Sequence, residues 1–156
     1  MDRKIQYTYK NLQNEIALIL EAKVSEDWRC NIWHVRGSER DLIIDTGLGL
    51  WPITKDIFQI SERPIIALCT HSHHDHAGGL SQFETRAGHP AEKNIFANPT
   101  RQSTVANLIK PEHLIEKPYE SFEIEKWCMN PAPITNLIQE GDVIDRSEEH
   151  TSELQS

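Results

Sequence analysis

The stretch Thr70–Leu80 reads THSHHDHAGGL, and its residues decide how the rest of the sequence is interpreted. It directly follows Pro64–Cys69, a continuous apolar run that is typical of a strand buried on both faces. Imidazole and carboxylate groups suit zinc, and the end of a strand is a rigid place from which to direct them. We therefore predict a metal site in this loop. Four residues follow the pattern H-x-H-x-D-H: His71, His73, Asp75 and His76.

The spacing within this loop indicates two metal subsites. In an extended turn, His71 and His73 can bring both rings to one metal, because side chains two residues apart point the same way. Asp75 and His76 then face a second metal. His74 occupies an x position of the pattern, so we expect its ring to point away. The alternative interpretation is a group of polar side chains on a solvated loop without a metal.

A second motif precedes this loop by about thirty residues: Leu42–Gly47 reads LIIDTG, a hydrophobic strand that ends in D-T-G. The pair of motifs resembles the metallo-β-lactamase fold superfamily, whose members combine a strand-terminal D-T-G with H-x-H-x-D-H. The sequence also resembles the metallo-β-lactamase domain-containing protein 2 group, described as acyl-coenzyme A thioesterases. That resemblance is carried by NIWHVRGSERDLIIDTGLGL, THSHHDHAGGLSQFE and LIQEGDVID. It covers Cys30–Phe83 well and Ile134–Asp145 moderately.

The resemblance implies a fold class and a metal cofactor. The expected fold is α/β (α+β), with this chain supplying the N-terminal half of a four-layer αββα sandwich. The implied cofactor is zinc, with two ions in the complete domain. His71 and His73 would be two of the three histidine ligands of the first ion. Asp75 and His76 would bind the second ion.

The resemblance also assigns a role to Asp45 and shows which ligands are missing. Asp45 would lie outside the ligand set and accept hydrogen bonds that fix the metal loop. Simple capping of the turn is an equal alternative for this residue. The superfamily completes its two sites with a later histidine in a T-P-G-H-T-like loop, a bridging aspartate and a further histidine. None of these three occurs in this sequence.

The resemblance implies zinc-dependent hydrolysis of a small-molecule substrate, an acyl-coenzyme A thioester, by metal-activated hydroxide. Asp75 would also act catalytically, by orienting the nucleophile and carrying its proton. Hydrolysis of hydroxyacylglutathione, a lactone or a β-lactam is the alternative within the superfamily. We expect the complete protein to be the enzyme. This chain alone is expected to be an inactive fragment, because its loop leaves each metal short of ligands.

Composition and charge limit the partners of the chain. Its 156 residues carry 16 Lys and Arg against 24 Asp and Glu, and the net charge of -8 disfavours nucleic acid. No apolar run approaches the ~20 residues of a transmembrane span. Three widely spaced cysteines fit reduced thiols, so we expect the chain to be cytoplasmic.

The last eleven residues, Arg146–Ser156, read RSEEHTSELQS and show no periodicity. This string resembles the translation of a sequencing-adapter oligonucleotide. We therefore interpret residues 1–145 as a partial domain and residues 146–156 as a non-native, artefactual tail. A natural polar tail is the alternative. His150 is accordingly excluded from the metal argument.

Apolar runs and turn residues predict alternating strands and helices. The expected strands are Glu15–Lys23, Cys30–Val35, Asp41–Asp45, Pro64–Cys69, Lys93–Ala97, and a hairpin of Ile134–Ile138 and Asp142–Asp145. The expected helices run from Pro52 to about Ile60, through one turn at Gly79–Phe83, and over Thr100–Ile109. Residues 110–133 contain four prolines and predict an irregular segment.

The remaining candidate residues have structural roles as their favoured interpretation. We expect His34 to be a packed or surface residue, because it lies in the middle of a strand and its ring points to one face of the sheet. We do not expect His89 or His113 to be ligands, because neither has a partner at metal-site spacing. Trp51 could line an acyl-binding groove or shield the core. Cys69 lies next to the loop, but in a buried strand it behaves as a small apolar residue.

Overall fold

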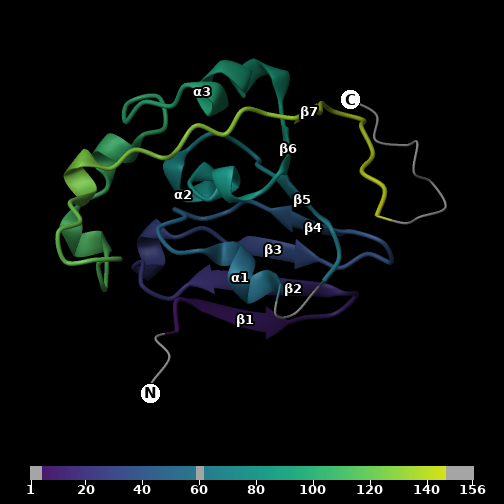
Figure 1. The fold of residues 1–156 in the computed structure, drawn as a ribbon, viewed down its shortest axis with the longest axis horizontal. Helices are drawn as coiled ribbons and strands as arrows, with labels where there is room; N and C mark the ends of the chain where they lie inside the picture. The colour runs from purple at the N-terminus through teal and green to yellow at the C-terminus, as the bar shows by residue number, and fades with distance from the viewer. Residues whose placement is uncertain (1–4, 59–61, 147–156) are drawn as a thin grey trace.

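The computed structural model describes residues 5–58 and 62–146, which contain one sheet of seven strands in sequence order (Figure 1). The strands are β1 Tyr7–Asn11, β2 Ile16–Glu21, β3 Ile32–Val35, β4 Asp41–Ile44, β5 Ile65–Leu68, β6 Thr85–Gly88 and β7 Asn136–Leu137. Strands β1 to β4 pair antiparallel, whereas β4 to β7 pair parallel. This mixed sheet with short helices confirms the expected α/β class.

The parallel pairing of β4 with β5 is what brings the two sequence motifs together. Leu42 pairs with Ile66 and Ile44 with Leu68, so the two strands end at the same edge of the sheet. The amide of Asp45 extends this pairing by donating to the carbonyl of Leu68 at 2.7 Å. The loops that follow β4 and β5 therefore leave the sheet side by side.

The helical elements are short. The α-helices are α1 Ile53–Phe58, α2 His74–Ala77 and α3 Lys93–Ala97. The 3-10 turns are η1 Glu26–Trp28, η2 Leu80–Gln82, η3 Pro90–Glu92, η4 Ala106–Leu108, η5 Pro111–His113 and η6 Ile124–Lys126. Within the described ranges, every helix is too short or too polar to qualify as a membrane span.

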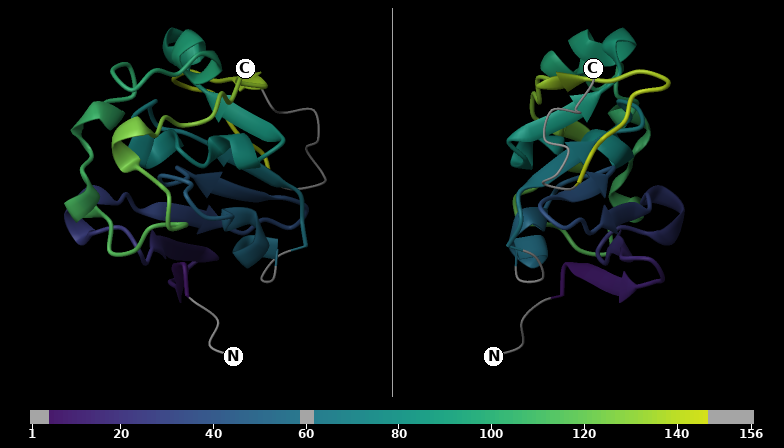
Figure 2. Two further views of the ribbon diagram at one scale, coloured as in Figure 1. Left: turned by 60° about the vertical axis from the view of Figure 1, so that its left-hand side comes forward. Right: turned by 90° about the vertical axis from the view of Figure 1, so that its right-hand side faces the viewer.

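The long segment between α3 and β7 descends to the level of β2 and then returns to β7 (Figures 1 and 2). Its lowest part is fixed by backbone hydrogen bonds: the amide of Ile115 donates to Lys23 at 2.7 Å, and that of Ser25 donates to His113 at 2.8 Å. The segment therefore covers the edge of the sheet at which β2 ends.

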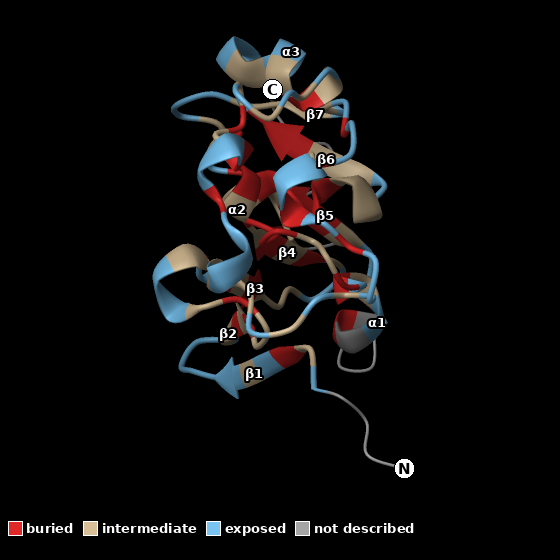
Figure 3. Ribbon diagram, turned by 90° about the vertical axis from the view of Figure 1, so that its left-hand side faces the viewer, coloured by how far each residue is buried: buried red, intermediate tan, exposed pale blue. Residues whose placement is uncertain are grey.

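The two faces of the sheet differ in burial. In β2, Ala17, Ile19 and Glu21 are buried and the alternate residues are half-buried. Figure 3 shows the buried residues gathered around β4, β5 and β6, while β1 is mostly exposed. On the second face, side chains paired across neighbouring strands form a half-buried apolar row: Leu18, Trp33, Ile44 and Leu68. That row leaves apolar surface in contact with solvent.

The predicted strands over β2, β3, β4 and β5 are confirmed, as are the turn at η2 and the start of α1. The predicted end of the α1 helix at Ile60 lies outside the described residues. So does the predicted tail, except for Arg146, which bonds the turn between β3 and β4 through Glu39 and Arg36. The irregular segment before β7 is also confirmed, because residues 110–133 contain no α-helix or extended strand, only short 3-10 helices, turns, bends and one bridge from Leu114 to Val24.

Three element predictions are wrong. Lys93–Ala97 is helix α3 rather than a strand, because the preceding η3 turn, capped by His89, directs the chain into a helix. Thr100–Ile109 forms turns and η4 rather than one helix, since Val105 has a positive φ of 52° that interrupts it. The expected final hairpin reduces to β7, which pairs parallel with β6, and residues 142–145 form no strand.

Candidate metal centre

The loop after β4 and the loop after β5 are joined by hydrogen bonds. Both the amide and the hydroxyl of Thr46 donate to the carbonyl of His76, at 2.7 and 2.8 Å. The amide of Gly79 donates back to the Thr46 hydroxyl at 3.2 Å. The D-T-G motif therefore forms the base on which the histidine loop lies.

Three imidazole rings of the predicted metal residues lie together. The ring centroid of His71 is 4.6 Å from that of His73 and 4.2 Å from that of His76. Nδ1 of His71 is hydrogen bonded to the Thr70 hydroxyl at 2.9 Å. Burial and the neighbouring His76 and His73 lower the pKa of His71, which favours the neutral ring that a metal requires.

Asp45 forms hydrogen bonds with both Thr70 and His76 of the histidine loop. Its backbone has a positive φ of 64°, which an aspartate tolerates better than most residues. One carboxylate oxygen accepts a hydrogen bond from the amide of Thr70 at 2.8 Å, and the other bonds Nδ1 of His76 at 2.8 Å. Asp45 thereby contacts the histidine loop and holds the ring of His76.

The surroundings of His76 have opposing effects on its pKa. Burial alone would lower the pKa of His76, but the hydrogen bond with Asp45 and the charges of Asp75 and Asp45 raise it. Nε2 lies 3.4 Å from a carboxylate oxygen of Asp75. The hydrogen bond with Asp45 occupies Nδ1 and leaves Nε2, the nitrogen nearest Asp75, without that partner.

The four predicted ligands fit zinc by the chemistry of their donor atoms, which are imidazole nitrogens and a carboxylate. They are neighbours, and one of them is oriented by a carboxylate in the way that metal-binding histidines commonly are. Within residues 5–58 and 62–146, however, no three His, Cys, Asp or Glu side chains already converge as a metal-binding group. The loop therefore supplies suitable donors without a finished coordination sphere.

His74 points away from this cluster, as expected. It is buried, and its Nδ1 is hydrogen bonded to the carbonyl of Thr104 at 3.0 Å. Its ring makes an edge contact with Trp127, with centroids 6.1 Å apart. Burial lowers the pKa of His74. The residue thus ties α2 to the long segment that precedes β7.

A buried carboxylate lies beneath the D-T-G loop. Glu21 has no exposed surface, and its two oxygens accept hydrogen bonds from the amides of Leu48 at 2.8 Å and Gly49 at 3.3 Å. Gly47 has a φ of 70°, and a side chain there would collide with the Glu21 carboxylate. Burial raises the pKa of Glu21 to about 7, against the effect of those two hydrogen bonds.

The other candidate residues are held in structural contacts. His34 is fully buried between Asp41 at 2.7 Å and the Tyr9 hydroxyl at 2.8 Å. Nδ1 of His89 accepts the amide of Ala91, and His113 stacks on Trp28 with centroids 3.8 Å apart. Trp51 is packed in the core, and burial raises the pKa of the Cys69 thiol. The residues of this set are: His34, His89, His113, Trp51 and Cys69.

Two residues that contact the candidate site were missed from the sequence. Glu21 carried a signal, because this charged residue directly follows the apolar run IALIL and lies on the same side of β2 as the buried Ala17 and Ile19. Glu92 carried none: it lies in η3, and its carboxylate bonds the amide of Ser72 at 2.8 Å. Only the sheet pairing, which places the loops after β5 and β6 side by side, brings Glu92 to the histidine loop.

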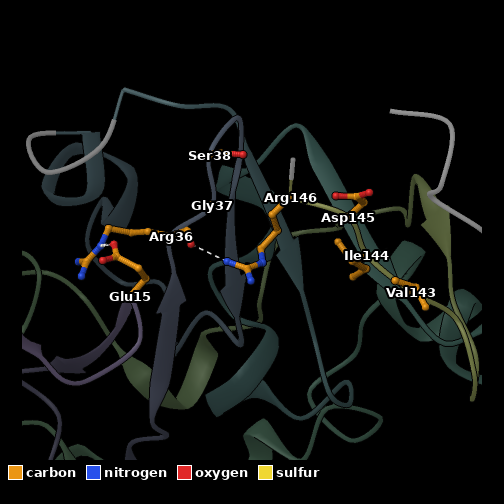
Figure 4. Close-up of a pocket in the computed structure, with 8 residues that line it drawn as sticks. All are labelled: Glu15, Arg36, Gly37, Ser38, Val143, Ile144, Asp145 and Arg146. Carbon is orange, nitrogen blue, oxygen red and sulfur yellow. Dashed lines mark hydrogen bonds and ion pairs between the residues drawn. The ribbon is translucent and has the colours of Figure 1, made fainter. Parts of the chain in front are cut away.

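A separate cavity of about 540 Å³ lies at the opposite end of β3 and β4 (Figure 4). Arg36 forms an ion pair with Glu15 at 3.0 Å in its wall, and Arg146 donates to the Arg36 carbonyl. The lining residues are Glu15, Arg36, Gly37, Ser38, Val143, Ile144, Asp145 and Arg146. The cavity therefore does not coincide with the predicted metal residues.

Comparison with known proteins finds a family that matches the part of the chain that carries these loops. Residues 26–98 match the family described as the Metallo-beta-lactamase superfamily. This range contains both the D-T-G strand end and the complete H-x-H-x-D-H loop. This match confirms the resemblance to the metallo-beta-lactamase superfamily that the sequence indicated.

Individual relatives of the chain carry names that state a particular activity. The human acyl-coenzyme A thioesterase MBLAC2 is 35% identical over 150 residues, covering 88% of this chain and 53% of that protein. The hydroxyacylglutathione hydrolase of Nitrosomonas europaea is 41% identical over 89 residues, covering 54% of this chain and 34% of that protein. The solved structure of TMB-1 has a TM-score of 0.50 at 20% identity, covering 59% of this chain and 47% of that chain, and supports the fold alone. The chain spans about half the length of the MBLAC2 relatives that it matches.

Proposed function

We propose that this chain is the N-terminal part of a zinc-dependent hydrolase that acts on acyl-coenzyme A thioesters. The observation that carries the proposal is the cluster of three imidazoles around His71, within which Asp45 fixes the ring of His76. The 35% identity to the acyl-coenzyme A thioesterase MBLAC2 supports the substrate class.

The proposed ligands of the metal are His71, His73, Asp75 and His76. Zinc is the metal that the superfamily generally binds, and when bound it lowers the pKa of water and polarises a carbonyl oxygen. Asp45 holds Nδ1 of His76 and leaves Nε2 for the ligand role. The Asp75 carboxylate lies 3.4 Å from that nitrogen. Its proposed role is to orient the attacking water and to accept its proton.

Hydrolysis of hydroxyacylglutathione is the second candidate. It is favoured by the 41% identity to the Nitrosomonas europaea hydrolase over 89 residues. The shorter coverage of this match, 54% of the chain against 88% for MBLAC2, is the reason for preferring the coenzyme A thioester.

Hydrolysis assays with different substrates test which of these activities the protein has. Zinc-loaded protein is incubated with a long-chain acyl-coenzyme A, S-lactoylglutathione and a chromogenic cephalosporin, both as this chain and as a longer product extended to the length of the MBLAC2 relatives. We expect the longer product to release coenzyme A, and His73→Ala to abolish that release. This chain is expected to be inactive, because four donors leave two metals short of ligands. Turnover of the cephalosporin alone would refute the thioesterase proposal.

A further inference from the structure

A carboxylate outside both sequence motifs contacts the middle of the histidine loop. Ser72 is only 2% exposed and lies between His71 and His73. Its amide donates to Oε2 of Glu92 at 2.8 Å, and its hydroxyl donates to the same oxygen. One carboxylate oxygen therefore fixes both donors of Ser72.

The direction of Ser72 determines where its neighbours point. Ser72 lies in the backbone directly between the two histidines, so its conformation sets the relative positions of His71 and His73. Ser72 is held inward, while the rings of His71 and His73 lie together with centroids 4.6 Å apart. A rotation of the backbone at Ser72 would displace both rings at once.

Glu92 is itself firmly placed. It ends the η3 turn, in which Nδ1 of His89 accepts the amide of Ala91 at 3.0 Å and the amide of Glu92 donates to the carbonyl of His89 at 3.1 Å. This turn follows β6, whose residue Thr85 pairs with Ile66 of β5. The strand next to β5 thus supplies the partner for the loop that follows β5.

We propose that Glu92 is a positioning residue that acts through Ser72 to hold the His71 and His73 rings side by side. The inference rests on the proposed function only in treating the two rings as metal ligands. Hydrogen bonds to a charged carboxylate are roughly twice as strong as neutral ones. Removal of Glu92 would leave the buried amide and hydroxyl of Ser72 without this acceptor, which is costly. Partners that hydrogen bond directly to a ligand commonly change metal affinity about 10- to 100-fold. Glu92 acts through Ser72, so we expect an effect at the lower end of this range.

The first test needs no metal. In the zinc-free chain, the nuclear Overhauser effect between the His71 and His73 rings is measured in Glu92→Ala, Glu92→Gln and a control, Glu84→Ala, at an exposed position. We expect Glu92→Ala to lose this effect. Glu92→Gln should retain it, because the amide oxygen can still accept both bonds. An unchanged effect in folded Glu92→Ala overturns the proposal.

A milder variant covers the case in which Glu92→Ala does not fold. Ser72→Ala removes only the hydroxyl donor and leaves the amide bond to Glu92, so it should weaken the ring-to-ring effect without abolishing the fold. A full-strength effect in Ser72→Ala together with an unfolded Glu92→Ala would show a role in stability alone and would overturn the proposal.

The second test measures zinc affinity by competition with a chromogenic chelator. We expect Glu92→Ala to bind zinc about tenfold more weakly or worse, and Glu92→Gln to stay within about threefold of the original chain. The double variant Glu92→Ala with Ser72→Ala should be no weaker than Glu92→Ala alone. If Glu92→Ala separates the rings yet the original chain takes up no zinc, the proposed function fails and the positioning role stands. If the rings separate and zinc affinity is unchanged, the link to metal binding is refuted.

Discussion

Ionisation of Glu21 should make the stability of the fold depend on pH. This carboxyl group has no exposed surface and accepts the amides of Leu48 and Gly49 from the D-T-G loop. Burial disfavours its charged form and raises its pKa from 4.5 to about 7, while the two amide bonds and nearby Arg29 oppose that change. In the unfolded chain the same group returns to the ordinary value.

The direction of the pH dependence of stability follows from which state, folded or unfolded, holds the proton on Glu21. Between pH 4.5 and about 7 the folded chain keeps a proton on Glu21 that the unfolded chain has lost. Unfolding therefore releases this proton, and the free energy of unfolding falls as the pH rises through that window. A tenfold change in proton affinity is worth about 1.4 kcal/mol, so the Glu21 contribution falls by about 3 kcal/mol and is then constant.

Urea unfolding measured across this pH range tests the prediction, with chelator present so that metal binding does not contribute. Glu21→Gln cannot ionise, so the stability of the original chain relative to this variant should fall by about 3 kcal/mol between about pH 4.5 and about pH 8. Glu84→Gln, at an exposed position, is the matched control and should show no such change. A stability difference between the original chain and Glu21→Gln that stays constant within about 1 kcal/mol would refute the reasoning.

Further predictions concern the loop, its metal and the open sheet face. Asp45→Asn should weaken zinc binding about 10-fold or more, since the charged partner of His76 is lost; unchanged affinity in chelator competition would contradict this, and Asp27→Asn at an exposed position is the control. Gly47→Ala should lower the free energy of unfolding by about 2 kcal/mol or more, because φ is 70° and Glu21 fills the space. Gly141→Ala, with φ 94° and nothing within 4 Å, should cost less, and equal costs in urea unfolding would show that the Glu21 contact is unimportant. Metal analysis after dialysis should find less than one tightly held zinc per chain, and retention of two would contradict the four-donor count. Trp33→Thr should reduce the emission of a dye that binds apolar surface, and unchanged emission would mean that the half-buried row is not its binding site.

The central part of the fold could be predicted because its signals are local. β2 and β5 are continuous apolar runs, and β3 and β4 combine β-branched residues with a turn between them. The outer strands lack these signals. β6 reads TRAG and β1 reads YTYKN, and β7 has only two residues, so their pairing is decided by neighbouring strands rather than by their own sequence.

The candidate site was also predictable only where its residues belong to short sequence motifs. The spacing of the histidine loop indicates metal chemistry, whereas the role of Asp45 was implied by the family resemblance. The structure brings the two together. The contacts made by Glu92 and Thr104 were not predictable, because each comes from a segment with no metal-ligand pattern and depends on how the strands are ordered. Which ions the loop holds remains part of the proposal, whereas the neighbourhood of the rings is a property of the fold.

The order of β4, β5 and β6 also has a kinetic consequence. The hydrogen bonds that shape the histidine loop join residues separated by 25, 31 and 20 positions: Asp45 to Thr70, Asp45 to His76, and Ser72 to Glu92. Each bond closes a chain loop whose entropy must be lost before the contact forms, and parallel pairing of this kind is slow. During synthesis, the histidine loop cannot reach its final shape until the residues of η3 have emerged from the ribosome. Metal competence is therefore expected to be a late event in the folding of this chain.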